Sequence, residues 1–168
     1  MTRSALEDST NKLLVIGIGN EFRNDDGIGL HVVRKLRKLN LSGIQIMEKS
    51  GEGAQLIELW KNETGVLIID ATSSGSEPGT IHRLDVAKKT IPSKFFHYST
   101  HNFSVAEAVE MARTMKQLPT HFILYGIEGK DFSQGVDITP VVKKAGEYIV
   151  DLIIEELRTA RSKAFSTH

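Results

Sequence analysis

Two aspartates and a histidine, Asp26, Asp70 and His101, are the residues of this chain best suited to chemistry. Carboxylate oxygens and imidazole nitrogens are common ligands of divalent transition metals, and three protein ligands leave coordination positions open for a substrate. The chain contains no cysteine, which excludes thiolate metal sites, disulfides and a cysteine nucleophile. If the fold brings the three side chains together, the sequence predicts a metal site with oxygen and nitrogen ligands.

The elements that must position these residues follow from short apolar runs that alternate with helical patterns. The apolar runs predict strands at 12–16, 44–47, 66–69 and 121–125, and helical spacing predicts helices at 24–39, 54–61, 104–116 and 140–157. The alternating segment 80–84 predicts an edge strand that runs antiparallel to its neighbour. We therefore predict an α/β single-domain three-layer sandwich. Its twisted, mostly parallel five-stranded sheet has one antiparallel edge strand and helices on both faces.

This topology decides which residues can meet. In open α/β sheets, ligands bind beyond the carboxyl ends of the strands, where the strand order reverses. Asp26 follows the first expected strand and Asp70 ends the third, so both should lie at that edge. The antiparallel strand leaves this edge, so the loop after it must return there and carry His101 with it. Glu128 and Asp131, which follow the last expected strand, reach the same edge and are rival ligands.

The segment after the first strand is dense in acidic residues and glycines. Asp25 and Asp26 fall in the first turn of the expected helix, where the helix dipole favours carboxylates; we assign a cap or supporting role to Asp25 and the ligand role to Asp26. Gly27 and Gly29 each cost up to about 1 kcal/mol relative to alanine inside a helix, which indicates close approach of a neighbouring segment or a substrate. They are candidate substrate-binding residues. The preceding Gly-Ile-Gly turn lacks the third glycine of a dinucleotide site, since Phe22 stands there, so a nucleotide-binding module is a weaker alternative.

Length and composition narrow the function classes. With 168 residues the chain fits one domain, 1–168, with 1–11 and 158–168 expected to be frayed. The 21 basic and 21 acidic residues give a formal net charge of zero, which argues against nucleic-acid and membrane-surface partners. No apolar run approaches the ~20 residues of a membrane span. The acidic N-terminal stretch does not resemble a signal peptide, so we expect a cytoplasmic protein.

Several short segments, in this order and spacing, make the chain resemble the hydrogenase maturation proteases. The segments are 17–20, 25–29, 67–71, 78–79, 99–101 and 135–140. Members of that family trim the C-terminal extension from the large subunit of nickel-containing hydrogenases. In them, an acid at the position of Asp26, an aspartate at that of Asp70 and a histidine at that of His101 bind metal. The metal is nickel that the substrate already carries; zinc or cadmium could substitute in crystals.

The resemblance implies a cytoplasmic, monomeric endopeptidase that acts on a nickel-loaded hydrogenase large-subunit precursor. Asp26, Asp70 and His101 would be both its catalytic and its metal residues. The resemblance leaves open whether the metal polarises the carbonyl, activates water or aligns the peptide, and whether an aspartate acts as the base. The alternative from another class is a nickel-dependent escort that binds the loaded precursor without cutting it.

One departure from the family concerns the turn after the second strand. Many members carry an Asp-Gly-Gly-Thr-like turn there, whereas this chain has Glu48 and Lys49 followed by Ser-Gly-Glu-Gly. The turn lies at the carboxyl edge of the sheet. We therefore predict that Glu48 and Lys49 bind substrate and influence the choice among precursors.

Overall fold

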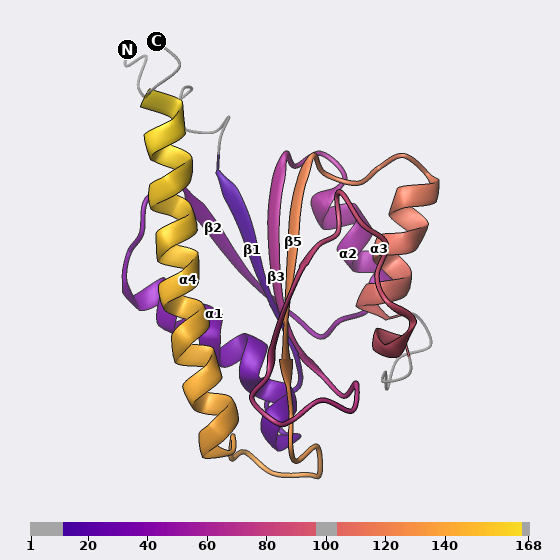
Figure 1. Ribbon diagram of the computed structural model, residues 1–168, viewed down its shortest axis with the longest axis vertical. Coiled ribbons are helices and arrows are strands. Elements are labelled where there is room, and N and C mark those ends of the chain that lie inside the picture. Colours follow the sequence, from indigo (N-terminus) through magenta and orange to yellow (C-terminus); the bar gives the residue numbers. More distant parts are fainter. Residues whose placement is uncertain (1–11, 97–103, 166–168) are drawn as a thin grey trace.

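The computed structural model describes residues 12–96 and 104–165, and it has a central sheet between two layers of helices (Figure 1). The strands are β1 (Leu13–Ile18), β2 (Ile44–Lys49), β3 (Gly65–Thr72), β4 (Ile81–Asp85) and β5 (His121–Glu128). Their order in the sheet is β2-β1-β3-β5-β4. All neighbouring pairs are parallel except β4 with β5, which are antiparallel. The predicted fold class, including the antiparallel edge strand, is confirmed.

The helices cover both faces of the sheet. They are α1 (Ile28–Lys38), α2 (Gly53–Trp60), α3 (Val105–Thr114) and α4 (Pro140–Phe165), with short 3₁₀ turns η1 (Asn24–Gly27) and η2 (Ser93–Phe95). Helices α1 and α4 lie on one face, and α2 and α3 lie on the other (Figure 1). Within the described part of the chain, no helix is long and apolar enough to cross a membrane.

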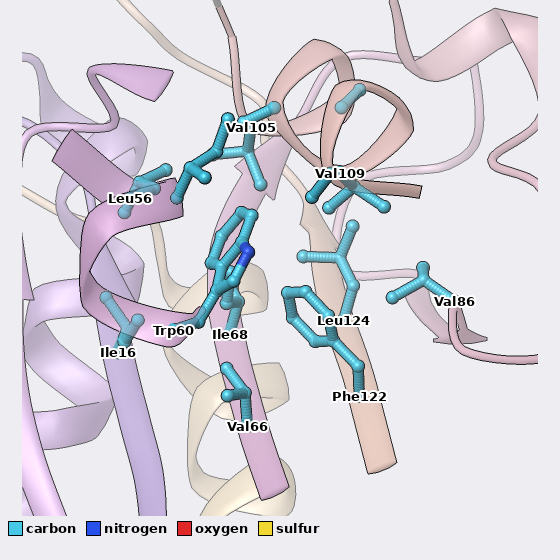
Figure 2. Close-up of a cluster of buried hydrophobic side chains, with 14 of the residues drawn as sticks. Ile16, Leu56, Trp60, Val66, Ile68, Val86, Val105, Val109, Phe122 and Leu124 are labelled. Carbon is cyan, nitrogen blue, oxygen red and sulfur yellow. The ribbon is translucent and has the colours of Figure 1, made fainter. Parts of the chain in front are cut away.

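Successive side chains of each central strand point to opposite faces of the sheet, so each face has its own hydrophobic core. In β3, Val66 and Ile68 pack toward α2 and α3, whereas Leu67 and Ile69 pack toward α1 and α4. Both faces are buried, which is why the central strands are continuous apolar runs in the sequence. In the α2–α3 core the rings of Trp60 and Phe122 lie side by side, 4.9 Å between centroids and edge to face (Figure 2).

All four predicted parallel strands continue beyond their predicted ends, and two of these extensions matter for the site. Strand β3 continues to Thr72 and β5 continues to Glu128, and the extensions pair with each other. Asp70 therefore lies within a strand, and Glu128 lies on the sheet instead of in the loop beyond it. The pattern ended β5 too early because Gly126 interrupts the apolar run.

The helix ends agree with the prediction in two places and differ in one. Ser104 caps α3 in a reciprocal capping box with Glu107, and α4 begins at Pro140 as expected. Helix α4 continues to Phe165, through most of the stretch from Arg158 that was expected to be frayed, and the fraying itself stays a prediction. The expected fraying of residues 1–11 lies outside the described residues.

Candidate active site

Asp26 and Asp70 lie on the two sides of the point where the strand order reverses. From β1 the chain goes first to β2 on one side and then to β3 on the other. Asp26 stands in η1, directly after β1, and Asp70 stands near the end of β3. The two carboxylates are close enough for the charge of Asp26 to act on Asp70. The structure therefore places both residues at the carboxyl edge of neighbouring strands, where the sequence predicted them.

The electrostatics of this pair are unfavourable in the protein alone. Burial raises the pKa of Asp70 well above its usual range, and the nearby charge of Asp26 raises it further. A backbone hydrogen bond from Ala71 only partly opposes the shift. Both effects disfavour a second negative charge at this place, and a bound cation would relieve both.

The loop before Asp26 holds its carboxylate in place. The backbone N–H of Asn20 donates to Oδ2 of Asp26 at 3.0 Å. Gly19 has to be glycine here, because a Cβ atom would lie only 2.0 Å from the backbone oxygen of Asp26. The Gly-Ile-Gly turn thus serves a close contact within the chain, and Asp26 stands in a fixed position.

Asp25 has a structural role in the protein. Its side chain is fully buried and accepts hydrogen bonds from the backbone N–H groups of Lys130, Asp131 and Thr139, at 2.7–2.9 Å. The hydroxyl of Thr139 donates to the same carboxylate. One carboxylate therefore ties residues 130–139 to the segment that carries Asp26. This supporting role agrees with the sequence-based assignment.

Glu128, the first rival ligand, is occupied by its own chain. It is buried and accepts from the hydroxyl of Thr72 at 2.8 Å and from the backbone N–H and hydroxyl of Ser74 at 2.6 and 2.9 Å. The N–H of Gly75 donates to it as well, at 3.0 Å. Burial acts to raise the pKa of Glu128, but these hydrogen bonds outweigh it and the pKa is lowered. Glu128 therefore orders the turn after β3.

Asp131, the second rival, is engaged in the loop tied down by Asp25. It accepts from the backbone N–H and the hydroxyl of Ser133 at 2.9 and 2.6 Å, and from the side-chain amide of Asn24 at 3.3 Å. The bonds from Ser133 lower the pKa of Asp131. Its carboxylate closes a local turn, which makes it a poor candidate for a metal ligand.

The glycines predicted to contact substrate instead contact their own chain. Gly29 is buried, and a Cβ atom there would lie 2.3 Å from the backbone oxygens of Ile18 and Ile69. Gly27 is also buried and lies against the backbone of Glu21, 3.2 Å from where its Cβ would be. Of the two explanations offered for these glycines, the neighbouring segment accounts for both, and the substrate contact stays a prediction. Gly29 lets α1 start directly on top of β1 and β3.

We predict that Gly29→Ala destabilises the protein by about 3 kcal/mol or more, because the new methyl group meets two backbone oxygens that cannot move independently. Urea denaturation monitored by circular dichroism measures the loss. Gly65→Ala is the matched control, since its Cβ would meet only the flexible Leu13 side chain, at 3.1 Å. Equal stability of the two variants would contradict the role assigned to Gly29.

Glu48 and Lys49 lie at the carboxyl edge, but they are not alike. Glu48 makes ion pairs with Arg34 and Arg37 of α1 at 2.8 and 2.7 Å, and its hydrogen bond with Arg37 lowers its pKa. Its carboxylate joins β2 to α1, so the predicted substrate contact of Glu48 is not supported. Lys49 pairs in register with Ile18 and has no carboxylate partner within 4 Å among the described residues. Lys49 stays a predicted substrate contact.

His101 lies outside the described residues, so its place in the site stays a prediction. Within the described ranges, no group of three or more potential ligand side chains could hold a metal ion. Asp26 and Asp70 therefore stay predicted metal ligands, and a complete ligand set would need at least one residue beyond these two.

One residue near the site was missed by sequence reasoning. His82 stands in the segment 80–84, for which the sequence predicted only an edge strand. In the structure it pairs with Gly126, which pairs in turn with Asp70 on the other side, so the three stand in one row across the sheet. Strand alternation placed His82 on the same face as Leu84, but only the register between β4 and β5 could have shown its proximity to Asp70.

Comparison with known proteins agrees with this geometry. The sequence model of the hydrogenase maturation protease family matches residues 30–156. The hydrogenase expression/formation protein HupD of Thiocapsa roseopersicina is 27% identical over 173 residues, with coverage of 95% of this chain and 77% of its own. The hydrogenase 2 maturation protease of Escherichia coli is 24% identical over 157 residues, with coverage of 91% and 94%.

A solved structure supports the fold independently. The hydrogenase maturating endopeptidase HybD from Escherichia coli superimposes with a TM-score of 0.73, at 22% identity, over 89% of this chain and 93% of that chain. At this identity the likeness establishes the three-layer fold and its strand order.

Proposed function

This chain belongs to the hydrogenase maturation protease family, and we propose that it removes the C-terminal extension of a nickel-containing hydrogenase large-subunit precursor after nickel insertion. As a member of the family it is an endopeptidase. The observation that carries the proposal is the pair of carboxylates, Asp26 and Asp70, at the point where the strand order reverses. Ligand and substrate sites of open α/β sheets lie at this point.

The donor set fits a nickel ion that the precursor brings with it. Asp26 and Asp70 offer oxygen ligands, and His101 would add an imidazole nitrogen; nickel accepts both kinds of ligand. With no thiolate available, the protein alone would hold the ion weakly, so the precursor would supply most of the remaining ligands. The nickel would supply Lewis acidity and alignment of the peptide. The residues of this chain would then recognise a loaded precursor and orient its C-terminal segment for cleavage.

We expect this protein to purify largely without metal and to cleave only the nickel-loaded precursor. The test incubates the purified protein with loaded precursor, and with nickel-free precursor in the presence of a chelator, and measures the precursor mass by mass spectrometry. Loss of the C-terminal extension should occur only in the first sample. Efficient cleavage of the nickel-free precursor would refute nickel recognition and favour a metal-independent aspartate mechanism.

The control for this experiment is His101→Ala, which should abolish cleavage of the loaded precursor. Stable binding of loaded precursor by the unaltered protein, with no change in precursor mass, would instead identify a non-cleaving escort. That alternative is not favoured, because the relatives are proteases. The nucleotide-binding alternative is not favoured either, since the glycine turn is used for contact with Asp26. Location in the cytoplasm and a monomeric state stay predictions.

A further inference from the structure

A small cavity opens beside Asp70 on the face of the sheet that α2 and α3 cover. It has a volume of about 50 Å³, with Asp70 at one side and His82 at the other. Gly126 of β5 lies at the floor of the cavity. It pairs in register with Asp70 of β3 on one side and with His82 of β4 on the other. Paired residues direct their side chains to the same face, so the missing side chain of Gly126 leaves a gap between a carboxylate and an imidazole.

Gly126 is tightly constrained. A Cβ atom there would lie 2.6 Å from Cγ2 of Thr72 and 3.6 Å from Cβ of His82. Any other residue would therefore displace the Thr72 side chain and fill the floor of the cavity.

The lining determines what the cavity can accept. The walls are mainly apolar, with Leu84, Phe95, Val105 and Leu124 among them, and the polar lining residues are Asp70, Thr72, Ser73, His82 and Ser104; Val105 and Leu124 belong to the core cluster of Figure 2. A charged side chain would lose most of its hydration against the apolar walls, which favours an uncharged one. The volume has room for roughly three or four non-hydrogen atoms.

The imidazole of His82, at the side of the cavity opposite Asp70, is held in place by contacts within the protein. Nε2 of His82 lies 3.3 Å from Oε2 of Glu128 and 3.5 Å from the hydroxyl of Ser74. The His82 ring also packs edge to face on Phe95, with centroids 5.0 Å apart. His82 is therefore a fixed wall of the cavity, and its ring nitrogen Nε2 is engaged with Glu128.

We propose that this cavity is the specificity subsite of the peptidase and takes the uncharged aliphatic side chain of the precursor residue next to the scissile bond. The inference rests on the proposed function, because Asp70 is at once a wall of the cavity and part of the site that would face that bond. Gly126 sets the depth of the subsite, and Phe95 limits its width.

The test uses the full chain and a set of nickel-loaded precursors in which each residue flanking the scissile bond is replaced in turn by Ala, Val, Leu, Phe, Lys or Asp. At one of the two positions, the unaltered protein should cleave the aliphatic precursors at least about tenfold faster than those with Phe, Lys or Asp. Phe95→Ala widens the cavity and should reduce the discrimination against Phe by about tenfold or more. Phe96→Ala is the matched control: it alters the neighbouring half-buried aromatic, which does not line the cavity, and should preserve the preference.

An unchanged preference in Phe95→Ala, or faster cleavage of the Lys or Asp precursors, would overturn the subsite while leaving the proposed function intact. If the unaltered protein cleaves no precursor, the proposed function fails, and methyl NMR then tests the cavity alone. Peptides that tile the C-terminal extension should shift the methyl signals of Leu84, Val105 and Leu124, and not that of Val15 on the opposite face. Absence of such shifts would overturn the subsite.

Discussion

Asp70→Asn should reduce cleavage of the nickel-loaded precursor by at least about a hundredfold and, in the metal-free protein, raise the melting temperature by several degrees. The two effects have one cause. Burial and the charge of Asp26 raise the pKa of Asp70 in the folded protein, so ionising this carboxyl costs folding free energy. Asparagine removes that cost and also removes the proposed carboxylate ligand of the metal.

The pH dependence of this stabilisation follows from the sign of the shift. A raised pKa in the folded state means that the cost is absent below the ordinary pKa of an aspartate, grows as the pH rises from there, and levels off above the folded-state pKa. The advantage of Asp70→Asn over the unaltered protein should therefore be largest at pH 8 and shrink toward pH 4. Thermal denaturation of chelator-treated protein across this range measures it. A constant advantage at all pH values would show that the charge of Asp70 is not its source.

The second large effect should separate the two adjacent aspartates. Asp25→Ala leaves the buried N–H groups of Lys130, Asp131 and Thr139 without their acceptor and should destabilise the protein by about 3–5 kcal/mol. Asp26→Ala should cost much less stability and instead abolish cleavage. Urea denaturation of both variants, together with the cleavage assay at a temperature where both are folded, distinguishes the roles.

The comparison of Asp25→Ala with Asp26→Ala can also contradict the roles assigned to these two residues. If Asp26→Ala destabilises the protein as much as Asp25→Ala, then Asp26 is a further structural anchor and the metal site would have to be sought elsewhere. If Asp25→Ala is as stable as the unaltered protein, the loop at 130–139 is held by other contacts.

The fold and the positions of Asp26 and Asp70 could be predicted from the sequence because they depend on local patterns. Apolar runs fixed the strands, and the rule for open α/β sheets placed Asp26 and Asp70 at one edge. The positions of Glu128 and His82 were not predictable. They depend on the extension of β5 through Gly126 and on the register of an edge strand, neither of which leaves a mark in a local pattern.

Other intrachain contacts escaped the sequence for the same reason. Gly29 was interpreted as a substrate contact because a glycine in a helix indicates close approach but does not reveal what approaches; in the structure, the backbone of β1 and β3 approaches it. Glu48 was interpreted as a specificity residue because its arginine partners on α1 stand more than ten positions earlier in the chain. Pairing over such distances is decided by tertiary packing.

The tie between Asp25 and Thr139 has a consequence for biosynthesis. Its two ends are separated by 114 positions in the chain, so this contact has a very high contact order and cannot form until nearly all of the domain has left the ribosome. A nascent chain that ends before residue 130 lacks the backbone donors of Lys130, Asp131 and Thr139 to the Asp25 carboxylate. The buried carboxylate of Asp25 then has none of these partners, so the segment that carries Asp26 should reach its final anchored state only after residues 130–139 have been added.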